Sequence, residues 1–249
     1  MPRWLRSWTT AATDLVFPPA CAFCNEPSPP LEDGTLLCKL CVSHLAHRQQ
    51  SLCPRCGLPA PAATPSEGAC PDCRAIKHSF CAVRSLGFYE NHVREAVLKI
   101  KHHSWEHLAM ALGRRLGAVA ADSPFPEPPD LVVPIPMHWL QRLYRGTSAA
   151  ETLARALASA SDWPFAGDLL RCLKMTKTQS QLTAPERRKN VKGAYAASRS
   201  YDISGARILL VDDVITTGAT CDSAAKVLVE SGATTVYAIS VARGTGMRS

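Results

Sequence analysis

Eight of the eleven cysteines in this 249-residue chain occur as four Cys-x-x-Cys pairs between residues 18 and 80. The first and second pairs enclose thirteen residues, and so do the third and fourth. Two cysteines three positions apart can bind one ion because a tight turn brings both sulfurs to one side, and four thiolates complete a zinc tetrahedron. The repeat therefore predicts two structural zinc sites. Their ligands are Cys21, Cys24, Cys38, Cys41, Cys53, Cys56, Cys70 and Cys73.

The equal spacing favours tandem sites, in which the first pair joins the second and the third joins the fourth, while interleaved pairing stays an alternative. Redox chemistry by the pairs is a weaker interpretation, because four pairs in repeat favour metal. The region has few apolar residues in periodic patterns. A module of this size cannot be held by burial alone, so bound metal is expected to supply much of its folding free energy.

Three histidines and three further thiols lie outside this ligand set. With eight cysteines present, His44, His47 and His78 are expected at the surface rather than on a metal. The remaining thiols are expected to be small buried apolar side chains. They are Cys81, Cys172 and Cys221.

The rest of the chain has an α/β pattern. A strand-like segment at 82–89 precedes helical patterns at 92–100 and 107–121, and the proline-rich stretch 123–129 ends the second helix. From residue 130 onward, short apolar runs alternate with helical segments, which predicts a mostly parallel sheet with right-handed crossovers. The strands are expected at 130–136, 169–174, 193–197, 207–213 and 234–242, and the helices at 148–160 and 219–231.

This pattern divides the chain into three parts. Residues 1–17 are expected to form a short helix, residues 18–80 the zinc module and residues 82–249 the α/β domain. The first residues lack the pattern of an export signal, and no apolar run is long enough to cross a membrane. We therefore expect a cytoplasmic protein without membrane insertion, whose thiols stay reduced.

One stretch combines the elements of a ribose 5-phosphate site. The apolar strand Ile208–Val211 is expected to end at the carboxyl edge of the sheet, where ligands bind in open α/β folds. Asp212 and Asp213 follow, and adjacent carboxylates can accept hydrogen bonds from a vicinal diol. Gly218 permits a tight turn, and a helix beginning at Ala219 favours a phosphate at its N-terminus. The phosphate-binding candidates are Thr216, Thr217, Gly218, Ala219 and Thr220.

The charge of the chain also favours an anionic partner. Its formal net charge is +7, and residues 171–207 hold nine basic residues against two acidic ones. Such a field attracts either a phosphorylated small molecule or a nucleic acid backbone. Aromatic residues make up only 6% of the chain and do not interleave with the basic ones, which is unlike a stacking platform for single strands.

The stretch RILLVDDVITTGAT (207–220) resembles the phosphoribosyl pyrophosphate loop of type I phosphoribosyltransferases. The order of motifs along almost the whole chain resembles the ComF family. After the cysteine pairs come Tyr89, Val93-Arg94, Leu98-Lys99 and Lys101, then VVPIPMHWLQRLYRG, then TKTQSQLTAPERRKNVKGAY. The resemblance implies a type I phosphoribosyltransferase fold with a mostly parallel sheet, an N-terminal double zinc ribbon and a link to DNA uptake in natural transformation.

The resemblance also implies where pyrophosphate binds. The loop after the first core strand would receive it, and the basic loop around 176–190 would close over the site, with Mg²⁺ bridging pyrophosphate and ribose oxygens. Gln179 and Asn190 are candidates to order that loop. The family usually continues its Arg-Gly motif with Phe-Asn-Gln, whereas this chain has Thr147-Ser148-Ala149. The pyrophosphate-binding candidates are Pro136, Met137, His138, Arg142, Arg145, Arg187 and Arg188.

Three functions remain open at this point. The first is an active phosphoribosyltransferase of unassigned acceptor. The second is a non-catalytic sensor of phosphoribosyl pyrophosphate that works with DNA-uptake or recombination proteins. The third is a single-stranded DNA-handling protein with a vestigial site. Loss of the usual amides after Gly146 makes ligand binding the firmer expectation and leaves turnover open.

Overall fold

The computed structural model describes residues 18–31, 34–47, 51–60, 70–71, 73, 78–122, 125–138, 140, 148–174, 186 and 191–245. The expected N-terminal helix at 1–17 lies outside these residues.

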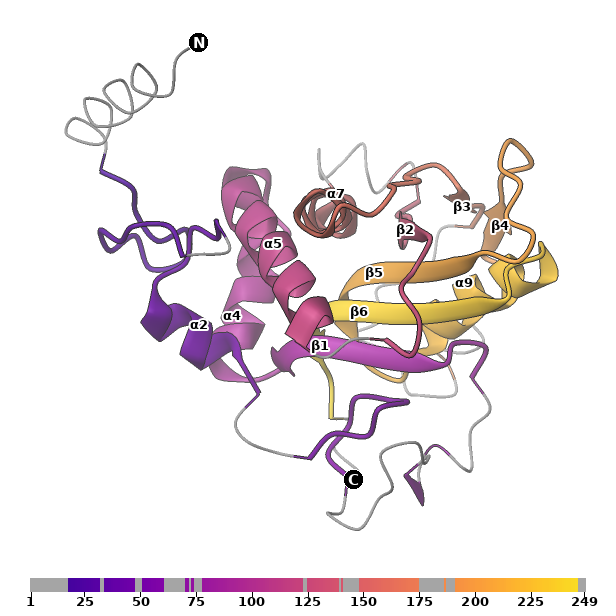
Figure 1. Cartoon of the computed structure of the whole chain (residues 1–249), viewed down its shortest axis with the longest axis horizontal. Coiled ribbons are helices and arrows are strands. Elements are labelled where there is room, and N and C mark those ends of the chain that lie inside the picture. The colour runs from indigo at the N-terminus through magenta and orange to yellow at the C-terminus, as the bar shows by residue number, and fades with distance from the viewer. Residues whose placement is uncertain are drawn as a thin grey trace.

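A four-stranded parallel sheet forms the centre of the molecule (Figure 1). Its strands, in spatial order, are β1 (Ala82–Phe88), β6 (Thr235–Arg243), β5 (Arg207–Ile215) and β2 (Leu131–Pro134). A separate antiparallel pair joins β3 (Leu170–Cys172) to β4 (Tyr195–Ala197). Every strand expected from the sequence is present.

Strand β5 is longer than expected. It continues past Val211 to Ile215 because β6 keeps pairing with it, opposite Ser240 and beyond. Strand β2 ends sooner, with Pro134 opposite Val211. The two aspartates therefore lie, as expected, at the carboxyl edge, on the part of β5 that projects past its shorter neighbour.

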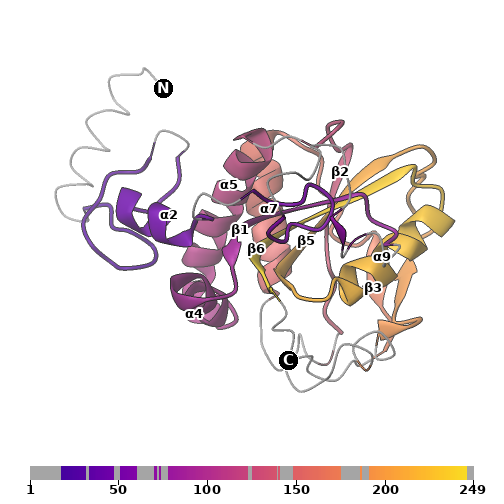
Figure 2. The same ribbon diagram turned by 90° about the horizontal axis from the view of Figure 1, so that it is seen from below.

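Helices cover both faces of the sheet (Figures 1 and 2). Helices α4 (Asn91–Lys99), α5 (Glu106–Asp122) and α7 (Ala149–Ser161) pack on one face, and α9 (Ala219–Glu230) packs on the other. The alternation along β5 explains this division, because successive side chains of a strand point to opposite faces. Two residues of β5 reach the first core and two reach the second; they are Leu209 and Val211, then Ile208 and Leu210.

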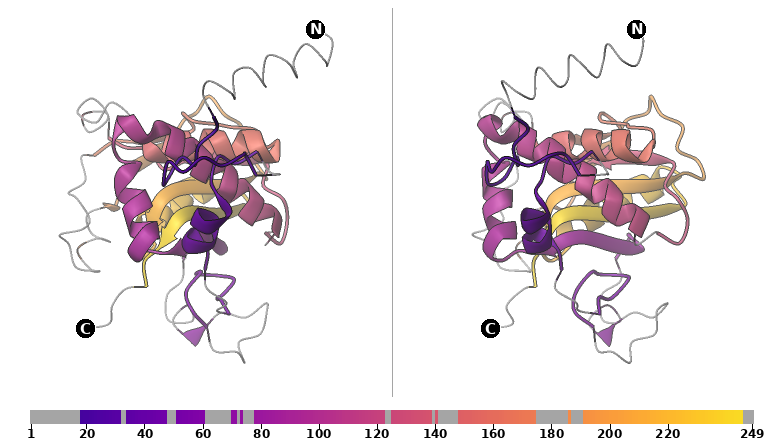
Figure 3. Two further views of the ribbon diagram at one scale, coloured as in Figure 1. Left: turned by 90° about the vertical axis from the view of Figure 1, so that its left-hand side faces the viewer. Right: turned by 60° about the vertical axis from the view of Figure 1, so that its left-hand side comes forward.

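The cysteine-rich segment lies along the β1 side of the α/β domain (Figure 3). Its first half, with helix α2 (Lys39–Leu45), packs into the core beside α4. Its second half contacts β1, where the backbone N–H of Val83 donates to the carbonyl oxygen of Pro54 at 3.4 Å. The architecture is thus the expected one, a mostly parallel α/β domain with a small N-terminal four-cysteine module.

The expectation that the three histidines lie at the surface holds only in part. All three are half-buried because their rings pack on neighbours. His44 stacks on His92, His47 meets Phe88 edge-on, and His78 stacks on Phe80. The expected burial of the remaining thiols holds for Cys221, which is buried, while Cys172 is half-buried and Cys81 is exposed.

Candidate functional site

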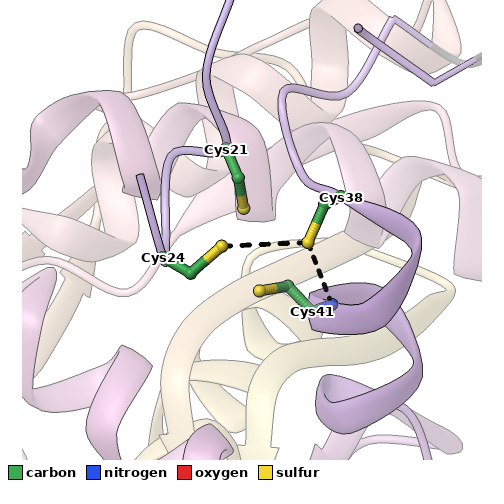
Figure 4. A group of neighbouring side chains, drawn as sticks. All are labelled: Cys21, Cys24, Cys38 and Cys41. Atoms are coloured by element: carbon green, nitrogen blue, oxygen red, sulfur yellow. Dashed lines mark hydrogen bonds between the residues drawn. The ribbon is translucent and has the colours of Figure 1, made fainter. Parts of the chain in front are cut away.

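The cysteines form two tandem groups of four. In each group the sulfurs lie within 4.8 Å of one another. The first group is shown in Figure 4, where the Sγ atoms of Cys24 and Cys38 are 3.8 Å apart. In the second group, Cys53 and Cys73 are also 3.8 Å apart. Zinc–sulfur bonds of about 2.3 Å place tetrahedral sulfurs about 3.8 Å from each other, so both groups fit one zinc ion.

The two groups share a repeated backbone turn. The N–H of Asn25 donates to the carbonyl of Cys21 at 2.9 Å, and the N–H of Gly57 donates to Cys53 at 2.8 Å. Asn25 and Gly57 each follow the second cysteine of a pair, and each has a positive φ, of 63° and 70°. This conformation suits glycine and is tolerated by asparagine. The sequence repeat is therefore a structural repeat, a tight turn that presents two sulfurs to one point.

The first cysteine of each turn is poised to bind metal. Burial raises the pKa of the Cys21 thiol, but backbone N–H donors from Cys24, Cys38 and Phe23 outweigh it and lower the pKa to about 7. The same balance lowers the pKa of Cys53 to about 7. Because zinc binds the thiolate, N–H groups aimed at sulfur favour the form that coordinates the metal.

The carboxylate pair lies where β5 projects beyond β2. Asp212 and Asp213 are both half-buried, and the N–H of Asp213 donates to Oδ1 of Asp212 at 2.8 Å. Lys101, in the turn after α4, places its Nζ 3.4 Å from Oδ2 of Asp213. Burial, and then the charge of Asp213, raise the pKa of Asp212 well above its usual range, and Lys101 opposes that shift. Two adjacent carboxyl groups at this edge favour a ligand that brings hydroxyl donors or a cation.

The turn Thr216–Thr220 begins directly after β5. Gly218 has φ 78°, and a Cβ there would lie 3.2 Å from the ring of Phe80. Helix α9 starts at the next residue, with the amide N–H groups of its first turn near this glycine. The arrangement gives an anion both the partial positive charge of a helix N-terminus and backbone approach without a side chain in the way.

One acid in the first turn of α9 is already engaged. Oδ1 of Asp222 accepts a hydrogen bond from the backbone N–H of Ser79 at 2.6 Å and lies 3.6 Å from Nδ1 of His78. Burial raises the pKa of Asp222, but these partners outweigh it and lower the pKa. Its negative charge is therefore directed toward the linker after the zinc module.

The residues expected to meet pyrophosphate are only partly described. Pro136 and Met137 are half-buried and His138 is buried, directly beyond the end of β2. The N–H of Ile135 donates to the carbonyl of Val211 at 2.9 Å, so this segment leaves the sheet beside the two aspartates. The remaining candidates and their loop partners lie outside the described residues: Arg142, Arg145, Gln179, Arg187, Arg188 and Asn190.

Ser148, which stands where the family usually has an amide, caps a helix here. Its Oγ accepts a hydrogen bond from the N–H of Glu151 in the first turn of α7 at 3.4 Å. Serine is a favoured N-cap residue, so the residue that replaces the amide has a local structural role.

Sequence reasoning missed Arg243, the last residue of β6. It is buried, with 5% of its surface exposed, and it donates to the carbonyl of Cys56 and to that of Ile215. The sequence did contain an indication of this residue, because it is basic and ends an otherwise apolar strand. A charged side chain that follows a run of buried residues needs hydrogen-bond or ionic partners.

The chain matches the double zinc ribbon domain family over residues 12–74. It is 30% identical over 226 residues to the DNA utilization protein YhgH of Salmonella typhimurium, covering 89% of this chain and 96% of that protein. It is 33% identical over 116 residues to Competence protein F of Haemophilus influenzae, covering 46% of this chain and 51% of that protein.

Among solved structures, a glutamine phosphoribosylpyrophosphate amidotransferase from B. subtilis, complexed with ADP and GMP, aligns with a TM-score of 0.39 and 22% identity. The alignment covers 57% of this chain and 30% of that chain. Within the described residues, none of the helices is both long and apolar enough to cross a membrane.

Proposed function

Because the chain belongs to the ComF family, we propose that it binds phosphoribosyl pyrophosphate together with Mg²⁺ and acts in the uptake or utilisation of DNA. The observation that supports the ligand best is the arrangement on β5. A carboxylate pair and a glycine turn at a helix N-terminus follow one another at the carboxyl edge of the sheet. Their order matches the diol and the 5-phosphate at opposite ends of one ribose. The names of the relatives support the link to DNA.

We assign the parts of the ligand as follows. Asp212 and Asp213 accept hydrogen bonds from the ribose hydroxyls, and the turn Thr216–Thr220 with the first turn of α9 holds the 5-phosphate. Pyrophosphate lies against residues 136–145 and the basic loop that carries Arg187 and Arg188. In this division residues 18–80 serve as a zinc-held structural module and residues 82–249 as the ligand-binding domain.

If the chain catalyses transfer, the reaction is displacement of pyrophosphate at the anomeric carbon of ribose. Bound Mg²⁺ would neutralise charge on the leaving group. The protein's own residues would orient the ribose through Asp212 and Asp213 and surround the departing anion with positive charge. Among the described residues we assign no base for an incoming acceptor, so the acceptor class stays open.

Two alternatives compete with transfer. One is a sensor that binds the same ligand without turnover; the replacement of the usual amides by Thr147-Ser148-Ala149 supports it. The other is a protein that handles single-stranded DNA and keeps a vestigial site; the basic segment 171–207 supports it. Pyrophosphate release measured over a panel of nucleobases and amines separates the transferase from the sensor. The salt dependence of single-strand affinity tests the DNA reading.

The proposed ligand is tested by thermal unfolding with and without phosphoribosyl pyrophosphate and Mg²⁺. Ligand at about 100 times its dissociation constant stabilises the folded state by about 2.7 kcal/mol, which corresponds to a rise of about 5–10 °C in a chain of this size. The double variant Asp212→Ala with Asp213→Ala is expected to lose the shift. A wild-type protein whose Tm does not move at millimolar ligand would contradict the proposal.

A further inference from the structure

Arg243 makes an unusual set of contacts for a buried arginine. Its Nε donates to the carbonyl oxygen of Cys56 at 2.6 Å. Its Nη1 donates to the carbonyls of Ile215 at 2.8 Å and Gly244 at 3.0 Å, and also to that of Thr216. All four acceptors are backbone oxygens, so this side chain stabilises the position of the backbone at each acceptor.

Three of the four acceptors belong to two functional regions of the chain. Cys56 is a member of the second four-cysteine group. Ile215 ends β5, and Thr216 opens the turn to which we assign the 5-phosphate. One guanidinium therefore bridges the second zinc turn and the phosphate turn, although Arg243 and Cys56 are 187 positions apart in sequence.

Among the described residues, Arg243 has no carboxylate partner. Its side-chain hydrogen bonds all go to carbonyl oxygens. A buried cation is costly unless an opposite charge lies nearby. Four thiolates around one Zn²⁺ would leave a net charge of −2 next to Cys56. Zinc would also fix the turn Cys53–Cys56, whose carbonyl oxygen at Cys56 accepts the hydrogen bond from Nε of Arg243, so loss of the metal would free one end of this bridge.

A second connection joins the same two regions. The segment after the fourth cysteine pair returns to α9, where the N–H of Ser79 donates to Asp222 at 2.6 Å. The ring of Phe80 borders Gly218, because a Cβ at that glycine would lie 3.2 Å from it. The segment after the second cysteine group thus contacts both the phosphate turn and the helix that follows it.

The first four-cysteine group makes different contacts. Phe23 lies between the two cysteines of the first pair and contacts the side chain of Lys99 from α4. Nζ of Lys99 is 4.7 Å from the centroid of the Phe23 ring and donates to the Phe23 carbonyl oxygen at 3.5 Å. The group packs into the core beside α4 and β1. The contacts described for this group thus lead to α4 and the core beside β1.

We propose that Arg243 is a positioning residue that makes the geometry of the turn Thr216–Thr220, and with it the affinity for a sugar phosphate, depend on zinc in the second site but not in the first. The identity of the ligand rests on the proposed function. The dependence of the turn on zinc does not, because it can be measured without ligand.

The first experiment compares Arg243→Gln with Arg84→Gln. Arg84 is the matched control, since its Nη1 also donates to the second zinc turn, at the carbonyl of Pro54 at 2.9 Å, while it also contacts the carbonyl of Val83 and the ring of Phe125. We expect Arg243→Gln to retain two zinc ions per chain and to lose at least tenfold in affinity for ribose 5-phosphate and for phosphoribosyl pyrophosphate with Mg²⁺. Arg84→Gln should change neither affinity by more than twofold.

The second experiment measures the turn itself. Hydrogen exchange of the backbone amides at 215–220 is followed in the ligand-free protein, in Arg243→Gln, and in paired cysteine variants. Cys53→Ser with Cys56→Ser empties the second site, and Cys21→Ser with Cys24→Ser empties the first. We expect faster exchange at 215–220 in Arg243→Gln and in the second-site variant only. If Arg243→Gln fails to fold, Arg243→Lys replaces it, because lysine keeps the charge but cannot reach several carbonyls at once.

The outcomes separate the two proposals. Unchanged exchange at 215–220 in both Arg243→Gln and the second-site variant, or equal acceleration by loss of either zinc, overturns the role of Arg243. Faster exchange at those amides in a protein that binds neither sugar phosphate supports that role and contradicts the proposed ligand instead.

Discussion

The ammonium of Lys101 lies 3.4 Å from the carboxylate of Asp213. The two residues come from different layers, because Lys101 follows helix α4 and Asp213 lies on the central strand β5. The first crossover of the fold thus returns a cation to the edge of the sheet where β5 carries its two acids. The charge of this cation opposes the rise in the pKa of Asp212 that burial and Asp213 cause.

Replacement of this cation should weaken ligand binding and shift it to higher pH. In Lys101→Gln the pKa of Asp212 rises further, since the favourable charge of Lys101 is lost. We expect about tenfold weaker affinity for phosphoribosyl pyrophosphate at pH 7, recovering as the pH is raised. Titration calorimetry at several pH values checks this. Lys226→Gln, on the exposed face of α9 beside Glu230, is the control and should bind as the wild type does.

Asp212→Asn should stabilise the ligand-free protein at neutral pH while it removes binding. The folded-state pKa of Asp212 is raised by burial and by Asp213, so the stability that this carboxyl group contributes is complete below about pH 4, its unfolded pKa, and is lost as the pH rises toward the folded value. The variant does not lose this stability, because its amide side chain does not ionise. Its Tm should exceed the wild-type value by a few degrees at pH 7, with the difference shrinking toward pH 4.

Asp202→Asn is the control of opposite sign. Hydrogen bonds from Ser204 lower the pKa of this exposed carboxyl group. Removal of this carboxyl group should therefore cause a small decrease in Tm at pH values above 4. A Tm difference for Asp212→Asn that does not change with pH would count against the assigned pKa direction.

Gly218→Ala should reduce both stability and ligand affinity. A left-handed conformation costs a non-glycine residue about 1–2 kcal/mol, and the added Cβ meets Phe80 at 3.2 Å. Gly205→Ala is matched to it, with φ 76° and no neighbour nearer than 4.0 Å. Thermal unfolding should show a loss in both variants. Only Gly218→Ala should lose affinity for ribose 5-phosphate, and equal affinities would place the 5-phosphate elsewhere.

Purified protein should contain two zinc ions per chain. Cys24→Ser should leave one, and the exposed thiol variant Cys81→Ser should keep two. Because zinc binding supplies folding free energy to such modules, Cys24→Ser should also lower the Tm, whereas Cys81→Ser should not. Elemental analysis with thermal unfolding gives both readings. A folded, metal-free wild-type protein would contradict the assignment.

Local patterns predicted the elements well, and long-range contacts account for what they missed. The apolar runs and the cysteine spacing are properties of neighbouring residues, so the sheet strands and both tandem groups could be predicted from them. The true end of β5 could not, because it depends on how far β6 continues beside it. The partners of Lys101 and Arg243 could not be predicted either, since the periodicity of a sequence does not indicate which distant residues a side chain will contact.

The position of β6 has a consequence for how the protein is made. This strand lies between β1 and β5, yet it is the last element of the sheet to leave the ribosome. Until it emerges, the first strand has no partner in the sheet, and the projecting end of β5 has none either. Because Arg243 is the final residue of β6, its bridge between the second zinc turn and the phosphate turn forms only after every strand of the sheet has been synthesised. A nascent chain that ends before Arg243 would contain all eight paired cysteines and still lack this bridge.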